Sequence, residues 1–203
     1  MAELCDRDVL PLFPLPDFVL FPNVHVPLNI FEPRYCEMIA EALDGSGTFC
    51  MGTLVGDWQN EYEGDPDFHQ TGCVCRLIDY ERHPDGRYNV LAEGIARVQI
   101  TEVTSKGLYR SVEIMTSPVG PVVDANGSIK RLREVGADAL VQVIGKAPDG
   151  LAERMHSIDL PTFINLLAFH LPLDVSDKLA LLDMPNGDTM IERLLQHCER
   201  LHA

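Results

Sequence analysis

The first 31 residues alternate short apolar runs with prolines, as in residues 10–15 (LPLFPL) and 26–30 (VPLNI). A proline has no backbone N–H, so we expect strands that contain Pro11, Pro14 or Pro27 to lie at sheet edges, strand starts or bulges. The apolar residues between the prolines need burial. The pattern therefore predicts two or three short strands here rather than a linker.

The pattern then becomes helical and returns to strands. Tyr35, Met38, Ile39 and Ala42 recur every three or four residues, which predicts a helix from Pro33 to about residue 43. Alternating or apolar segments predict strands over residues 48–55, 73–82, 87–93, 96–103 and 108–115. Successive strands with regular turn signals, including a tight Asp-Gly turn at 85–86, indicate a meander that closes or nearly closes into a β-barrel.

Residues 117–121 (SPVGP) resist both helix and strand and predict a boundary between a β-rich domain, residues 1–117, and a helical domain, residues 118–203. Helical spacing of apolar residues predicts helices over 129–146, from about 151, and over 162–171, 177–182 and 189–201. Asp159, Ser176 and Asp188 precede the last three and are expected to be their N-caps. The helix over 162–171 is apolar on nearly every side, so we expect it at the core of a bundle.

Three ordered motifs resemble the Lon N-terminal domain, the substrate-recognition module of Lon proteases that also occurs in free-standing proteins. They are the proline-rich opening up to Tyr35, the segment 72–78 (GCVCRLI), similar to a Gly-X-X-X-Arg-Ile strand, and the segment 85–98, similar to a hairpin followed by Leu-X-X-Gly-X-X-Arg. The resemblance implies an α+β fold, in which a PUA-like β pseudobarrel with one packed helix precedes a C-terminal helical bundle. It also implies a free-standing protein that recognises peptide or partly unfolded protein segments.

Four residues match positions of these motifs: Arg34, Gly72, Gly94 and Arg97. We expect all four to be structural. The two arginines are expected to pair with carboxylates that hold the barrel and the helix together, because guanidinium groups form strong bidentate pairs with carboxylates.

The sequence lacks the catalytic motifs of a full-length Lon protease. The Gly-X4-Gly run from Gly47 to Gly52 is followed by Thr53 and Leu54, where a phosphate-binding loop has Lys and Ser or Thr. None of the four lysines lies in a recognisable Ser–Lys arrangement, and no Gly-X-Ser-X-Gly elbow occurs. We therefore expect no catalytic residue, no cofactor and no enzymatic activity.

Six cysteines without the spacing of a disulfide framework indicate reduced and mostly buried thiols. Cys73 and Cys75 could join His69 in a zinc site, which leaves a metal- or cysteine-dependent enzyme as an alternative function. The Cys-X-Cys spacing on a strand favours buried apolar thiols instead, and we expect no metal site.

The formal net charge is −15, with 31 acidic and 16 basic residues. Such a charge repels phosphate backbones, so we expect no nucleic-acid partner. The start of the chain does not resemble a secretory signal, and no apolar run is long enough to span a membrane. A cytoplasmic protein without a membrane partner is expected, and the sequence does not indicate its oligomeric state.

The segment 57–71 is acidic and carries three aromatic residues, Trp58, Tyr62 and Phe68. Aromatic anchors in polar surroundings are typical of interfaces, so these three are the candidate residues for binding a peptide or a partner protein. The alternative is that the rings fold back over the barrel as a lid.

For the client, we expect an apolar stretch bound in a groove between barrel and bundle, with acidic residues favouring basic flanks. A module for adaptor contacts or oligomerisation is the remaining alternative.

Overall fold

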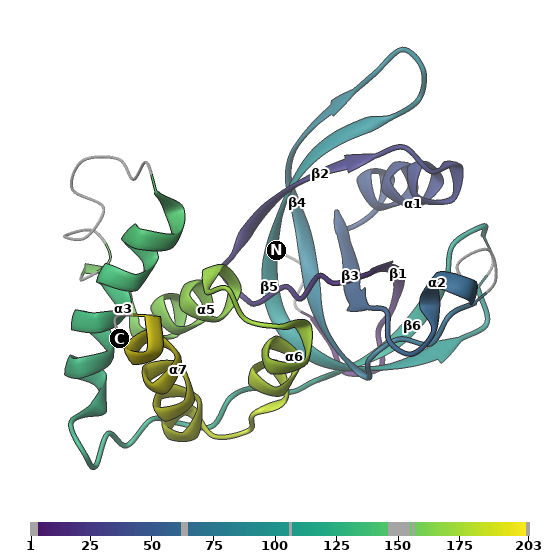
Figure 1. The fold of residues 1–203 in the computed structure, drawn as a ribbon. Helices are drawn as coiled ribbons and strands as arrows, with labels where there is room; N and C mark the ends of the chain where they lie inside the picture. The colour runs from purple at the N-terminus through teal and green to yellow at the C-terminus, as the bar shows by residue number, and fades with distance from the viewer. Residues whose placement is uncertain (1–3, 62–64, 106, 146–154, 156, 202–203) are drawn as a thin grey trace. The chain divides into compact units, whose positions relative to one another are not determined.

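The computed structural model describes residues 4–61, 65–105, 107–145, 155 and 157–201. The described chain is α+β and divides into two compact units, Met1–Pro118 and Val119–Ala203. All the described strands belong to the first unit (Figure 1). Within the described ranges, no helix has both the length and the apolar character needed to cross a bilayer.

The first unit is a six-stranded sheet with one long and one very short helix. Its elements are β1 (Val9–Leu15), β2 (His25–Ile30), α1 (Pro33–Asp44), β3 (Thr48–Thr53), α2 (Trp58–Glu61), β4 (Thr71–Arg82), β5 (Tyr88–Val103) and β6 (Ser111–Thr116). The strand order is β2-β5-β4-β3-β1-β6, and β5 also pairs with β6. Five strands therefore close into a ring, and β2 is attached to the outside of the ring through β5.

The predicted meander is wrong in one respect, because β1 lies between β3 and β6 and runs parallel to β3. A parallel pair needs a long connection, and here β2 and α1 supply it. The ring encloses a core to which each of its five strands contributes. These buried residues are Leu10, Leu12, Cys50, Val74, Val98, Ile100, Val112 and Ile114.

The prolines of β1 are tolerated because this strand changes partner half-way. Residues Val9 to Pro11 pair with β6, whereas Leu12 to Leu15 pair with β3. Each half of β1 is thus an edge on one side, where a missing N–H breaks no ladder. Pro27 lies in β2, which pairs with β5 alone, so the expectation of an edge strand is confirmed there.

The two strands predicted over 87–93 and 96–103 are one strand, β5. Its register with β4 shifts between Val74 and Cys75, where Ile95 is the extra residue, and again between Leu77 and Asp79, where Ile78 is extra. These β-bulges let the strands bend without ending. The first half of β5 joins β2 and β4 in a three-stranded extension, and the second half closes the ring with β6. The β4–β5 hairpin is the long arm seen in Figure 1.

The second unit is helical, with α3 (Ser128–Ile144), α5 (Leu160–His170), α6 (Val175–Asp183) and α7 (Gly187–Leu201). Helix α5 contacts the other three, and its Phe163 and Leu167 are fully buried. Gly136 of α3 allows this approach, because a Cβ there would lie 2.9 Å from Leu167 Cδ1. The helix predicted from about residue 151 falls outside the described residues.

One of the three predicted N-caps is correct. Asp159 accepts a hydrogen bond from the Thr162 N–H at 3.0 Å. The predictions for Ser176 and Asp188 are wrong because both helices begin earlier, so these residues lie in the first turn. Asn186 Oδ1 accepts from the Thr189 N–H at 3.1 Å instead.

Candidate functional site

The three-stranded extension exposes one face that is built in rows. Because in-register residues of neighbouring strands share a face, three rows run across β2, β5 and β4. The first row is Asn29, Asn89 and Glu81; the second is Pro27, Leu91 and Asp79; the third is His25, Glu93 and Arg76. We call this surface the row face. The opposite face carries Val26, Ile30, Tyr88, Val90 and Ala92, all of them buried.

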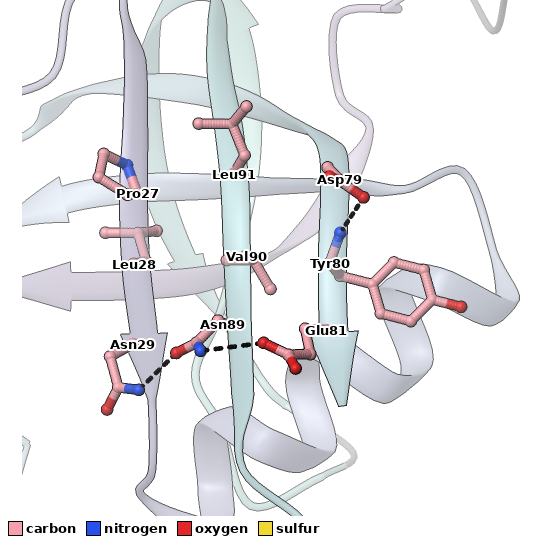
Figure 2. A pocket seen from close by; sticks show the side chains of 9 residues that line it. All are labelled: Pro27, Leu28, Asn29, Asp79, Tyr80, Glu81, Asn89, Val90 and Leu91. Atoms are coloured by element: carbon pink, nitrogen blue, oxygen red, sulfur yellow. Dashed lines mark hydrogen bonds between the residues drawn. The ribbon is translucent and has the colours of Figure 1, made fainter. Parts of the chain in front are cut away.

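The first row is a chain of polar contacts that joins the three strands (Figure 2). Asn29 Nδ2 donates to Asn89 Oδ1 at 2.7 Å, and Asn89 Nδ2 donates to Glu81 Oε2 at 3.5 Å. Asn89 Nδ2 also lies 2.8 Å from His83 Nε2. These contacts cross-link the edge strand β2 to the hairpin arm and hold the row face in one arrangement.

The third row is an ion-pair network. Arg76 Nη2 donates to Glu93 Oε2 at 2.6 Å, and His25 Nε2 lies 3.6 Å from Glu93 Oε1. Glu93 is therefore placed between the imidazole of His25 and the guanidinium of Arg76, which balances its charge. The Glu93 carboxylate thus has contacts with two side chains of the protein itself.

Over the first and second rows the face is hollowed, with a volume of about 430 Å³. Each of the strands β2, β4 and β5 contributes three residues to the lining of the hollow. They are Pro27, Leu28, Asn29, Asp79, Tyr80, Glu81, Asn89, Val90 and Leu91. One side of the hollow is the second row, where exposed Pro27 and half-buried Leu91 stand beside the exposed carboxylate of Asp79. An apolar floor thus meets acidic groups at one end.

The two carboxylates of the hollow lack a strong cationic partner. Asp79 Oδ1 accepts the N–H of Tyr80 at 2.9 Å, and Glu81 Oε2 lies 4.0 Å from His83 Nε2. In the part of the chain that the structure describes, no lysine or arginine pairs with either residue. The hollow consequently presents uncompensated negative charge next to apolar surface.

The candidate aromatic residues fall in different surroundings. Trp58 opens the short helix α2 and is half-buried, whereas Tyr62 lies outside the described residues. Phe68 is half-buried, packs against the barrel core and pairs with Leu54 in an isolated β-bridge. Its ring lies under the guanidinium of Arg110, with Arg110 Cζ 4.7 Å from the centroid. Phe68 therefore has the placement expected of a ring folded back onto the barrel, and a binding role for the three stays a prediction.

The buried cysteines are the chemical alternative to a binding surface. Cys50, Cys73 and Cys75 are buried in the first unit, and Cys75 Sγ donates to the Cys73 carbonyl at 3.4 Å. Burial raises the pKa of Cys50 and of Cys75 well above the usual value for a thiol. A raised pKa disfavours the thiolate that a nucleophilic cysteine needs, so Cys50 and Cys75 are poor candidates for nucleophiles.

Comparison with known proteins decides the family. The profile of the ATP-dependent protease La (LON) substrate-binding domain matches residues 9–200, which is nearly the whole chain. The chain belongs to the LON substrate-binding domain family. The resemblance seen in the sequence motifs is thereby confirmed.

Relatives of this LON domain include whole Lon proteases. The Lon protease of Escherichia coli K12 is 24% identical over 202 residues, which is 97% of this chain and 25% of that protein. The Lon protease of Geobacter metallireducens is 28% identical over 208 residues, covering 98% of this chain and 25% of that protein. The chain thus spans about a quarter of the length of the curated relatives that it matches.

Solved structures share the fold of this LON domain. The N-terminal domain of a Mycobacterium avium complex Lon protease has a TM-score of 0.72 at 15% identity, covering 95% of this chain and 98% of that one. A Lon N-terminal domain protein from Xanthomonas campestris has a TM-score of 0.63 at 21% identity, with 93% and 98% covered.

The four motif residues of the LON domain all make close contacts within the first unit. Arg34 donates Nε–H to Glu32 Oε2 at 3.0 Å, at the start of α1. Arg97 is buried and donates Nε–H to the Ser117 carbonyl at 2.5 Å. A Cβ on Gly72 would stand 2.7 Å from the Met51 carbonyl oxygen, and one on Gly94 would collide with the Phe21 carbonyl. Both glycines are therefore sites where two backbone segments meet.

Sequence reasoning missed the row face of the LON domain. Its residues were assigned to strands, but the pairing of β2 with β5 is set by contacts between segments some 60 residues apart. A usable signal was present: Asp79 and Glu81 alternate on β4, as Asn89 and Leu91 do on β5. That period of two places polar and apolar groups on a single exposed face.

Proposed function

We propose that this LON domain recognises polypeptide, holding extended segments of partly unfolded protein, and performs no chemistry on them. The observation that carries the proposal is the family match over residues 9–200, made to a substrate-binding domain. The relatives named above are Lon proteases, and the part of them that corresponds to this chain is about a quarter of their length. The proposed partner is a polypeptide client, and the proposal needs no cofactor or metal.

The surface chemistry supports the same proposal. Polypeptide recognition needs apolar contact area together with polar groups that fix orientation. The row face supplies both, in a hollow of about 430 Å³ on the outside of a cross-linked sheet. The half-buried Trp58 is proposed to add an aromatic contact on the same unit, with Tyr62 and Phe68 in the same segment.

The proposal places the protein in a reducing compartment, the cytoplasm. The six cysteines, all within the described residues, form no disulfide, and Cys5 is exposed and Cys36 half-buried. Free thiols persist where glutathione and thioredoxin keep them reduced.

Binding of labelled unstructured peptides, followed by fluorescence anisotropy, tests the proposal. Trp58 is the single tryptophan of the chain, so its emission gives a second readout on the protein side. We expect saturable binding of apolar peptides and a change in emission if Trp58 takes part. The proposed function would be contradicted if no labelled peptide showed a rise in anisotropy at protein concentrations up to about 1 mM. A Kd of about 1 mM corresponds to a binding free energy of about −4 kcal/mol.

A further inference from the structure

The row face has a more specific chemistry than general polypeptide binding requires. Its middle row places Pro27 and Leu91 beside Asp79, and the next row ends on Glu81. Both carboxylates are exposed, and neither is paired with a lysine or arginine in the described residues. By contrast, Glu93 in the third row is held by Arg76 and His25.

The arrangement distinguishes two kinds of acidic group on one sheet. Glu93 is paired with Arg76 Nη2 at 2.6 Å, so it is part of the scaffold. Asp79 has a single hydrogen bond, from the N–H of Tyr80, and Glu81 contacts the neutral amide of Asn89 at 3.5 Å. A carboxylate accepts up to about four hydrogen bonds, so both residues keep acceptor capacity that faces the hollow.

We infer that this hollow binds a stretch of extended polypeptide in which an apolar side chain stands two positions away from a lysine or arginine. The apolar side chain lies on Pro27 and Leu91, and the cation reaches Asp79 and Glu81. This inference rests on the proposed function and gives it a location and a client chemistry.

Charge and geometry both favour this occupant over other polypeptide segments. Alternate side chains of an extended chain point the same way about 6.7 Å apart, and neighbouring strands of a sheet are about 4.8 Å apart. An apolar residue and a cation two positions away therefore span the distance from the floor of the hollow to its acidic side. An acidic segment would meet both the two carboxylates and a net charge of −15.

The test uses the full chain and three labelled peptides of identical apolar sequence that carry Lys, Gln or Glu at the same two positions. The double variant D79N/E81Q removes the charge of the hollow and keeps the shape of its side chains. The matched control D44N/E113Q makes the same change in net charge at exposed acids elsewhere. Asp44 ends α1, and Glu113 is paired with Thr101 in the second half of β5.

Wild-type protein and the D44N/E113Q control are expected to bind the Lys peptide about three- to fivefold more tightly than the Gln peptide, since an exposed ion pair contributes up to about 1 kcal/mol. In D79N/E81Q this preference is expected to fall below about twofold, with affinity for the Gln peptide unchanged. Equal loss in the control and the double variant would overturn the inference, because only net charge would then matter. Peptide binding with an unaltered Lys preference in D79N/E81Q would also overturn it while leaving the proposed function intact. Absence of binding by the wild type to any peptide would refute both.

Discussion

Arg110 and Glu102 are joined by two parallel hydrogen bonds, Nε to Oε1 and Nη2 to Oε2, both 2.7 Å long. Arg110 Nη1 also donates to the Pro66 carbonyl at 2.6 Å, and its guanidinium covers Phe68. One side chain, from the residue just before β6, therefore ties β5 to the segment 57–71, which carries the three candidate aromatic residues. The hydrogen bond from Arg110 holds the pKa of Glu102 below its ordinary value.

This pair predicts a pH-dependent contribution to stability. Because the pKa of Glu102 is lower in the folded protein, the stabilisation is complete above the unfolded pKa of about 4.5 and is lost as pH falls through the folded value. The Glu102 side chain is 45% exposed, so solvent screening limits the effect to under about 1 kcal/mol. Denaturant unfolding of wild type and Glu102→Gln should differ by this amount at pH 7, and the difference should shrink as the pH falls below 4.5. Glu113→Gln is the control, and a constant difference across this range would contradict the prediction.

Gly94 is expected to tolerate no side chain. Its carbonyl accepts the Asn23 N–H at 2.7 Å and its N–H donates to the Val24 carbonyl at 2.9 Å, so the chain before β2 lies directly against it. A Cβ would meet the Phe21 carbonyl, which is backbone and cannot turn aside. Gly94→Ala should lower the free energy of unfolding by about 2–4 kcal/mol in denaturant titrations.

The matched control for Gly94 is Gly45→Ala. Gly45 ends α1 at a negative φ of −110°, and the nearest atom to a Cβ there is the Glu41 carbonyl oxygen at 3.3 Å. We expect a change within about 1 kcal/mol. Equal losses of unfolding free energy in Gly94→Ala and Gly45→Ala would contradict the claim that the close backbone approach at Gly94 excludes a side chain.

Asp159 is expected to stabilise the second unit as the N-cap of α5. Asp159→Ala removes the acceptor for the Thr162 N–H and should cost about 1 kcal/mol. Hydrogen bonding from the Thr162 backbone lowers the pKa of Asp159, so its contribution should be lost as pH falls through the folded value, below 3.8. Ser176→Ala is the control, since Ser176 lies inside α6, and it should change thermal unfolding little. A larger effect from Ser176 than from Asp159 would contradict these cap assignments.

The six thiols are expected to react in a fixed order with an aromatic disulfide reagent at pH 8. Cys5 is exposed and should react first, and Cys36, whose pKa is raised by desolvation, should follow slowly. Cys50, Cys73, Cys75 and Cys198 are buried, and burial raises the pKa of Cys198 to about 11, so these should react only after unfolding. Mass spectrometry of the labelled peptides checks the order. A hyper-reactive buried cysteine would instead favour a cysteine-dependent activity.

Local sequence patterns predicted much of the fold, and the failures have physical causes. The helix predicted from Pro33 is α1, because proline at the first turn and an apolar stripe are local signals. The parallel pairing of β1 with β3 has no local signal, since it depends on which distant strand is available. The continuity of β5 was missed because Gly94 looks like a break, whereas it marks a bulge where another segment crosses.

The site shows the same division between local and non-local information. The aromatic residues of segment 57–71 stand out by composition, but the partner of Phe68 is Arg110, which is 42 positions away and could not be identified from spacing. The row face requires three strands in register, and only the β4–β5 hairpin has a turn signal. Motif resemblance therefore indicated the family, while the surface that we propose to bind the client needed the fold.

Calorimetric titration of the protein with one polypeptide in two states tests polypeptide recognition most directly. The ligand is a small disulfide-bonded protein, used native and after reduction and neutral alkylation, so that composition is the same and only folding differs. We predict saturable heat with the unfolded form and none with the native form. Equal heats for both forms, or no heat with the unfolded form, would contradict the claim that this domain recognises unfolded chain.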